Sequence, residues 1–410
     1  MTREDRRTFD PAALIELRRH LHANPELRFT ERETQAHLQQ LLGGLEGLAI
    51  EPIAETGLLV HLPDRGPGPS VLLRADMDAY PVTETSGVPF SSRRDGVAHM
   101  CGHDIHMTIL VGVIDALLSA PPSAGRVTAL FQPAEEIPYG QASGAATVVA
   151  TGRLDDHYDA VLGLHVWPDL PGGTVGVNSP ISMAAKDAFQ IEVRGVGAHV
   201  ASAYRGRDAI LAASSLVTSL HASMNRRRAA PDMLGFNIGT IHGGASQSLV
   251  APSVEMTGTI RTHDDRVSRQ MRALVEDIAA GTARSYDVEV EVTWDGDIPA
   301  VVNHPALIRA ALGLAEDGLT VTELPRSPMT ADDFAWLTRL GPGLYLKLGT
   351  ATATDPEPAP LHSPDFLADE GAIEVGVTAL TTLTRRVLAG EVSGLTCEST
   401  TPDNPMKGTV

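Results

Sequence analysis

The sequence predicts an α/β protein in which a larger domain with a mostly parallel sheet carries an inserted domain of ferredoxin-like β-α-β-β-α-β order. Three observations predict this class. Short apolar runs alternate with helix-like stretches in the first part of the chain, which favours a layered α/β architecture. The middle of the chain changes to alternating strands and long helices, and the α/β pattern returns after it. The 410 residues, 43% of them apolar, suffice for two or three domains.

The first part of the chain is expected to open with two helices. The first is expected to be capped by Asp10, to begin at Pro11, which suits the first helical position, and to end at Asn24-Pro25. The second opens with Thr30 and Glu33 in capping-box spacing. Beyond them, strands are expected at residues 58–62, 71–73, 127–131, 160–164 and 344–348, and helices at 107–118 and 140–150.

The middle of the chain is expected to form the inserted domain, residues 185–296. It interrupts the larger, split domain, composed of residues 1–184 and 297–410. The tail of that domain from residue 393 shows no periodicity and is expected to be disordered. Within the insert, strands are expected at 187–193, 234–241, 253–261 and 288–292, and helices at 208–226 and 264–284.

The charge and cysteine content narrow the class of protein. A net charge of −19 repels phosphate backbones and anionic lipid, so neither nucleic acid nor a membrane is an expected partner. Two cysteines, Cys101 and Cys397, rule out a disulfide framework and fit a reducing compartment. The first ten residues lack the apolar core of a secretory signal, and the most apolar stretches are shorter than the ~20 residues of a membrane span. A cytoplasmic protein is expected.

Polar side chains directly follow three of the predicted strands. Asp76 and Asp78 follow the first, Glu135 and Glu136 follow the second, and His165 follows the third. Ligands of open α/β sheets bind at the carboxyl ends of the strands, so these side chains are expected to converge.

Residues 99–106 contain a thiol, three imidazoles and a carboxylate. Soft sulfur together with imidazole suits zinc and similar transition metals. The alternative is a polar loop before a helix, with Cys101 as a small buried apolar residue. A dinuclear hydrolytic site also needs a free carboxylate as base and a donor to the developing oxyanion. Adjacent glutamates can divide metal binding and proton transfer between them.

Several motifs occur in a fixed order between Leu17 and Leu383, close to the whole chain. They read RRHLHANPEL, LLRADMDAYPV, HMCGHDIHMT, LFQPAEE, GLHVWP, GVGAHVASAYRGRDAI, TADDFAWL and LHSPDF. On these motifs the chain resembles the metal-dependent amidohydrolases that include aminoacylases, hippurate hydrolases and plant auxin-conjugate hydrolases, within the dinuclear-metal exopeptidase superfamily.

The resemblance implies two divalent metal ions per subunit, zinc or manganese. Glu135 matches the general base, and Asp78 matches an acid that orients a metal-ligating imidazole. The residues that match metal ligands are Cys101, His103, Glu136, His165 and His362.

The resemblance also gives the insert a role as lid and dimerisation surface of a homodimer. His199 matches a histidine that reaches the partner's active site and polarises the scissile carbonyl. Arg261 matches a residue that holds the substrate carboxylate, a task that suits a guanidinium fork. The remaining histidines, among them His22 and His106, are expected at the surface or at helix caps, although His106 could also support a metal ligand.

The expected reaction is hydrolysis of the amide bond of an N-acyl amino acid or similar small amide by a metal-activated water. The alternatives are a dipeptidase or carboxypeptidase-type exopeptidase, and a metal-binding sensor or carrier without turnover. Glu135 and His199 argue against the last. Departures from the motifs, such as Ala203-Tyr204 and Asp332 in place of glutamate, lie where substrate is expected and leave the substrate open.

Overall fold

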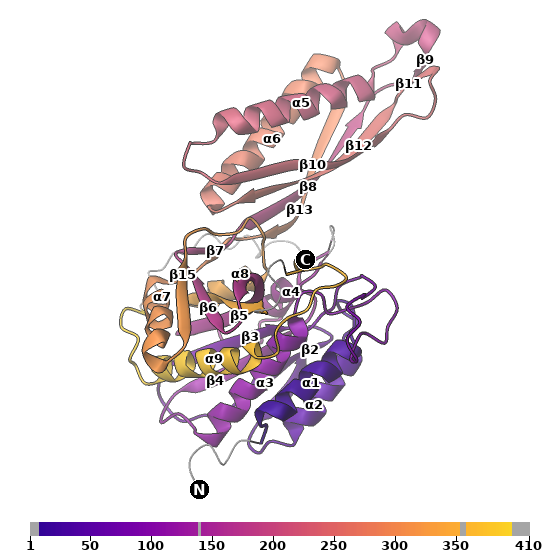
Figure 1. The fold of residues 1–410 in the computed structure, drawn as a ribbon. Helices are drawn as coiled ribbons and strands as arrows, with labels where there is room; N and C mark the ends of the chain where they lie inside the picture. The colour runs from indigo at the N-terminus through magenta and orange to yellow at the C-terminus, as the bar shows by residue number, and fades with distance from the viewer. Residues whose placement is uncertain (1–7, 138–140, 353–357, 396–410) are drawn as a thin grey trace.

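The computed structural model describes residues 8–137, 141–352 and 358–395. Two layered parts are joined by a narrow junction, an α/β part with the larger sheet and a smaller part with two helices on one sheet (Figure 1). Cys397 and all but the first three residues of the predicted disordered tail fall outside the described residues. Within the described residues, none of the helices combines the length and apolar character that crossing a bilayer requires.

The larger sheet has eight strands in the order β1-β2-β4-β3-β5-β16-β6-β15. Its centre, from β4 to β16, is parallel, and β6 pairs with β15 in parallel. The β1–β2, β2–β4 and β6–β16 pairs are antiparallel. The strands are β1 (Ala49–Ile53), β2 (Gly57–His61), β3 (Ser70–Asp76), β4 (Arg126–Gln132), β5 (Ala160–Pro171), β6 (Thr174–Asn178), β15 (Thr320–Leu324) and β16 (Gly343–Ala351).

Helices cover both faces of this sheet, which explains why its strands are nearly continuous apolar runs. Val71 and Leu73 of β3 point into the core under the longer helices, whereas Leu72 points into the core on the opposite face. The first face carries α1 (Pro11–Ala23), α2 (Arg32–Gly43), α3 (His103–Ser119), α7 (Pro305–Leu312) and α9 (Ala372–Leu388), and the second carries α4 (Gly144–Ala150) and α8 (Phe334–Leu337).

The start of the chain shows one correct and one wrong prediction of a helix cap. The Asp10 carboxylate accepts a hydrogen bond from Ala13 N at 2.8 Å, as expected before a helix that begins with proline. The capping box of α2 is wrong. The Thr30 hydroxyl donates to Leu27 O, and Glu31 stands at the cap without a side-chain cap bond. Its carboxylate instead accepts from Ala134 N at 2.9 Å, so it supports a loop of the neighbouring layer.

The smaller part has the predicted ferredoxin-like order of elements. Its strands β8 (Ala185–Arg194), β10 (Leu234–Gly243), β12 (Ser253–Thr262) and β13 (Glu289–Ile298) form an antiparallel sheet in the order β10-β12-β8-β13. Both helices, α5 (Ala209–Arg227) and α6 (Asp265–Tyr286), pack on the face that carries Phe189, Ile191 and Val193. The domain limits stay a prediction, and β13 continues to Ile298.

Short elements lie at the two ends of this smaller part. At its junction with the larger part, β7 (Ile181–Met183) pairs with β14 (Val301–Val302). At the far end, β9 (Ala198–His199) pairs with β11 (Leu249–Val250) (Figure 1). The 3₁₀ helices are η2 (Val200–Arg205), η3 (Gly313–Asp317) and η4 (Thr338–Leu340).

Candidate metal and catalytic site

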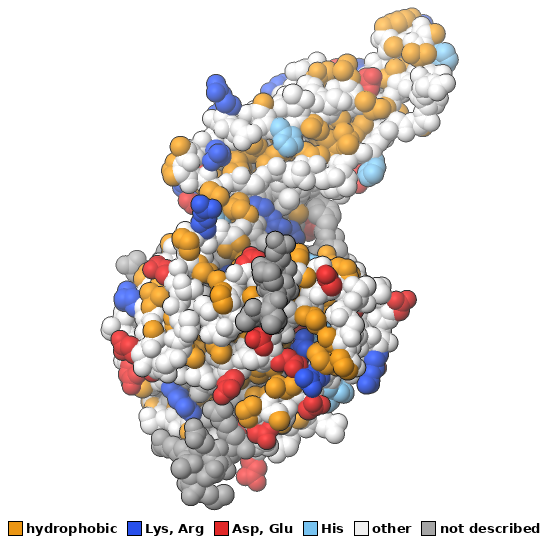
Figure 2. All heavy atoms as spheres, in the orientation of Figure 1, with side chains coloured by type: hydrophobic (Ala, Val, Ile, Leu, Met, Phe, Trp, Pro, Cys, Tyr) orange, Lys and Arg blue, Asp and Glu red, His pale blue; other side chains and the backbone are white. Residues whose placement is uncertain are grey.

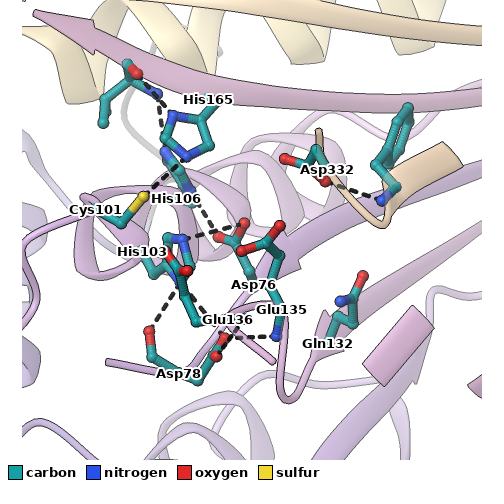
Figure 3. A network of polar contacts seen from close by, with 12 residues as sticks. Asp76, Asp78, Cys101, His103, His106, Gln132, Glu135, Glu136, His165 and Asp332 are labelled. Atoms are coloured by element: carbon teal, nitrogen blue, oxygen red, sulfur yellow. Dashed lines mark hydrogen bonds and ion pairs between the residues drawn. The ribbon is translucent and has the colours of Figure 1, made fainter. Parts of the chain in front are cut away.

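Polar side chains from several elements meet at the carboxyl ends of the central parallel strands (Figure 3). Asp76 ends β3, and the loop after β4 carries Glu135 and Glu136. His165 lies within β5, and His103 is the first residue of α3. The parallel strands therefore bring together the three groups of residues that were expected to converge.

The five predicted metal ligands lie together. Cys101 Sγ is 3.3 Å from His165 Nε2 and 3.2 Å from His362 Nε2. His362 Nε2 is in turn 2.6 Å from a carboxylate oxygen of Glu136. Candidate ligand atoms within 4.8 Å of one another form overlapping groups that share members, namely Cys101/His103/His165, Cys101/Glu136/His362 and His103/Glu135/Glu136.

These donors fit a pair of transition-metal ions. Thiolate and imidazole suit zinc, and a carboxylate between two groups of ligands suits a second ion. His103 Nε2 is buried and has no hydrogen-bond partner among the described residues. A buried imidazole nitrogen without a partner is costly, and a bound cation would satisfy it.

Backbone carbonyls fix the orientation of two of these imidazoles. His165 Nδ1 lies 2.7 Å from Val166 O, and His103 Nδ1 lies 2.8 Å from Asp78 O. A carbonyl oxygen only accepts, so we assign the proton of each ring to Nδ1. This leaves the Nε2 lone pair of each ring free to bind a metal ion.

The carboxylate of Asp78 holds the loop that carries the two glutamates. It accepts hydrogen bonds from Glu135 N at 2.9 Å and from Glu136 N at 2.8 Å. One of its oxygens is also 3.5 Å from His103 Nδ1, farther than the Asp78 carbonyl. Asp78 therefore contacts an imidazole of the predicted ligand set. It also holds the backbone of the predicted base and of a predicted ligand, a contact that the motif did not indicate.

Glu135 lies in a strongly acidic environment. Its carboxylate forms a group with those of Asp332 and Asp333, whose oxygens lie within 4.8 Å of one another. Burial raises the pKa of Glu135 well above its ordinary value, and the charges of Asp332 and Glu136 raise it further. Divalent cations would offset this accumulation of negative charge.

A buried row of polar side chains lies behind the candidate ligands, and only the supporting role considered for His106 pointed to it. His106 Nδ1 donates to Asp76 at 2.6 Å, and its Nε2 accepts from Val166 N at 2.9 Å. Arg74 bridges Asp76 at 2.7 Å and Asp333 at 3.0 Å. Two charged residues inside an otherwise apolar strand, Arg74 and Asp76, were the available signal, because buried charges need partners.

The expectation that His22 and His106 lie at the surface or cap a helix is wrong, because both are buried. His22 Nδ1 contacts Asp104 at 2.8 Å, and the Arg18 guanidinium lies 2.8 Å from the same carboxylate oxygen. Asp104 follows His103 directly in the chain, so this buried triad supports the start of α3 rather than binding metal.

The two predicted residues of the smaller part lie apart from the ligand groups. Arg261 is half-buried on β12, one row before the end of the sheet that meets the junction. His199 is exposed on β9, and its Nδ1 accepts a hydrogen bond from Ala201 N at 3.1 Å. Figure 1 places β9 at the end of the smaller part farthest from the larger sheet. His199 is therefore not part of the site of its own subunit.

Comparison with known proteins identifies the family. The model of peptidase family M20/M25/M40 matches residues 72–386. N-acetyl-L-cysteine deacetylase of Bacillus subtilis is 35% identical over 366 residues, 88% of this chain and 84% of the relative. N-acetyldiaminopimelate deacetylase of Lacticaseibacillus casei is 33% identical over 375 residues, 90% of this chain and 96% of the relative. The crystal structure of the Bacillus subtilis YXEP protein, described as a dinuclear metal binding peptidase from the M20 family, superposes with a TM-score of 0.78 at 31% identity. It covers 92% of this chain and 98% of that one.

The chain belongs to peptidase family M20/M25/M40. It is an enzyme of the metal-dependent amidohydrolase type, and its cofactors are two divalent metal ions. A sensor or carrier without turnover is thereby set aside. The fold prediction is confirmed, including the inserted layer.

Proposed function

We propose that this enzyme hydrolyses the amide bond of N-acyl amino acids in the cytoplasm, as the aminoacylases and hippurate and auxin-conjugate hydrolases that it resembles do. One observation carries the proposal. The group His103/Glu135/Glu136 contains one carboxylate beyond the five proposed ligands, that of Glu135. This is the arrangement that amide hydrolysis requires, with metal ligands and a separate base. The names of the two deacetylase relatives support an N-acyl amino acid as substrate.

In the proposed mechanism, Cys101, His103, Glu136, His165 and His362 hold the metal ions. When bound, the two ions would polarise the scissile carbonyl and lower the pKa of the attacking water. Glu135 accepts the proton of that water and returns it to the leaving nitrogen.

The smaller part supplies the remaining groups in this proposal. Arg261 binds the substrate carboxylate from β12. His199 polarises the scissile carbonyl in the site of a partner subunit, so the functional unit is a homodimer formed through the insert. Its exposed position at the far end of the smaller part supports delivery to another subunit.

The variant Glu135→Gln tests the base. It should bind metal normally, because Glu135 is not among the proposed ligands, and turnover should fall by roughly 10²–10⁴. Metal content is measured by atomic absorption, and activity on N-acetyl, N-benzoyl and N-indoleacetyl amino acids. Glu374→Gln, an exposed glutamate on α9, is the matched control and should retain full activity. Near-normal turnover of a metal-loaded Glu135→Gln enzyme would overturn the mechanism.

A second candidate function is exopeptidase activity on dipeptides. The peptidase family to which the chain belongs favours it, and the same ligands and base would serve. Adding dipeptides to the substrate panel decides between the two, because the class with the higher kcat/KM identifies the function.

A further inference from the structure

Two positive side chains face each other on the helix-free face of the smaller sheet. In the β8–β12 register, Lys186 lies directly opposite Arg261. Phe189, Ile191 and Val193 point toward the helices, so Lys186, an odd number of positions from each, points to the other face. Ile260 lies in the helix-side core as well, which places Arg261 on the same open face as Lys186.

Hydrogen bonds across the junction hold this pair close to the catalytic carboxylates. Ala184 N donates a hydrogen bond to Thr330 O at 2.8 Å. Ala184 precedes Lys186 by two residues, and Thr330 precedes Asp332 by two residues. His263 Nε2 contacts Pro328 O at 2.9 Å, two residues after Arg261. Figure 2 shows basic side chains gathered at this junction. The segment that contacts both strands therefore leads directly into the acidic group around Glu135.

Gly235 leaves room beside the pair. It lies opposite Arg261 on β10. A Cβ atom there would be 3.3 Å from Arg261 Cβ and 3.7 Å from Met329 Cε. The aliphatic part of Arg261 therefore lies near Met329, in the segment that crosses the junction. Because position 235 on β10 is glycine, it has no side chain that could displace the guanidinium.

Neither cation has an ion-pair partner within the part of the chain that the structure describes. Both are half-buried, and burial lowers the pKa of each. The charge of Arg261 lowers the pKa of Lys186 further, while Glu135, Glu136 and Asp295 raise it. Like charges directly opposite in a sheet are destabilising, so an anion bound between the two side chains would be favourable.

We propose that Lys186 and Arg261 together select N-acyl amino acids that carry a second carboxylate, such as N-acyl derivatives of aspartate and glutamate. The inference rests on the proposed function and names its substrate class. Arg261 binds the α-carboxylate and Lys186 binds the side-chain carboxylate. The net charge of the chain is −19, so most of its surface repels a dianionic substrate. Binding such a substrate therefore requires positive side chains at the site itself, and Lys186 and Arg261 are two.

The test compares N-acetylglutamate with N-acetylglutamine, which has the same shape without the second charge. The metal-loaded wild-type enzyme should prefer N-acetylglutamate, and Lys186→Met should lower kcat/KM for it by roughly 10- to 100-fold, the range for a hydrogen bond to a charged group. The same variant should leave kcat/KM for N-acetylglutamine within about twofold. Lys186→Arg keeps the charge and should retain the preference. Arg269→Met, which removes an exposed charge on α6, is the control and should change neither value.

The outcomes separate this inference from the proposed function. Two results would overturn the inference: an equal loss of kcat/KM on both substrates in Lys186→Met, or a wild-type enzyme that does not prefer N-acetylglutamate. In either case, hydrolysis of N-acetylglutamine would still support the proposed function. A metal-loaded wild-type enzyme that hydrolyses neither substrate, nor N-acetylmethionine, would overturn both. If Lys186→Met fails to fold, a Lys186→Gln variant is measured on the same two substrates.

Discussion

Lys347 is a fully buried cation on β16, beside the catalytic site but without an acidic partner among the described residues. Its Nζ lies 2.6 Å from Met183 Sδ and 4.4 Å from the centre of the Trp167 ring. Burial lowers its pKa from 10.5 to about 7, although the charge of Asp332 raises it. A thioether and aromatic faces solvate an ammonium group only in part, so the charge destabilises the fold.

We expect Lys347→Met to stabilise the protein at pH 7 by about 1–4 kcal/mol, by analogy with the range found when buried ion pairs are replaced by apolar side chains. Between pH 7 and 10.5 the unfolded chain holds a proton at Lys347 that the folded chain lacks, so wild-type stability rises with pH relative to the variant. Urea unfolding at pH 7 and pH 10 should show the advantage of Lys347→Met shrinking. A constant difference at both values would contradict the assignment, and Lys347→Arg, charged throughout, should show no gain.

At the scale of elements, the start of α3 determines the geometry of the proposed metal ligands. Gly102 precedes the helix with φ 80°, in the left-handed region that favours glycine. A Cβ atom there would lie 2.3 Å from Val166 Cγ2, on the strand that carries His165. Gly102 also separates Cys101 from His103. Its conformation therefore sets the distance between two proposed ligands and a third on β5.

We expect Gly102→Ala to weaken metal binding, because the added methyl group forces α3 away from β5 and the new φ is strained. Competition with a chelator, followed by metal analysis, should show at least a roughly tenfold loss of affinity, the lower range for altered support of metal ligands. Gly281→Ala in α6 is the control, since a Cβ there meets no atom within 4 Å. Unchanged metal affinity in Gly102→Ala would show that the loop adapts without moving its ligands.

At the scale of the whole molecule, the proposed dimer explains why a predicted catalytic histidine lies far from the ligands of its own chain. Several large apolar side chains are also exposed near β9, among them Val200, Tyr204 and Leu249. Burying such side chains between two copies is favourable, and a two-fold axis would give each subunit's site a histidine from the other.

Mixing two inactive variants tests this arrangement. His199→Ala alone should lower turnover by roughly 10²–10³, the scale of one lost oxyanion donor. When His199→Ala subunits exchange with Glu135→Gln subunits, the mixture should regain up to about a quarter of wild-type activity. Half of the dimers are then mixed, and each mixed dimer has one complete site out of two. Each variant incubated alone is the control. Demonstrated subunit exchange without recovery of activity would refute the shared site.

Local sequence signals predicted much of the fold and the grouping of candidate ligands. Apolar runs bounded by polar residues gave the central strands, and polar residues at their ends gave Glu135, Glu136 and His165. The failures have a common cause. The capping box expected from Thr30 and Glu33 does not form, because Glu31 stands at the cap of α2 and its carboxylate accepts from Ala134 N, 103 positions away in the chain. His106 was expected at the surface or at a helix cap, but it is buried and hydrogen-bonded to Asp76 and Val166. Both depend on partners that are distant in sequence.

The sequence by itself determined which chemistry this protein carries, because donor types, their order and their positions after strands are local properties of the chain. Only the tertiary structure decided how the charges are arranged around that chemistry. It joined Arg74 to Asp76 and Asp333, set Lys186 opposite Arg261, and left His199 exposed at the far end of the smaller part. The physical reason is that burial and electrostatic pairing depend on which segments pack together, and no local pattern encodes the register or the distance between them.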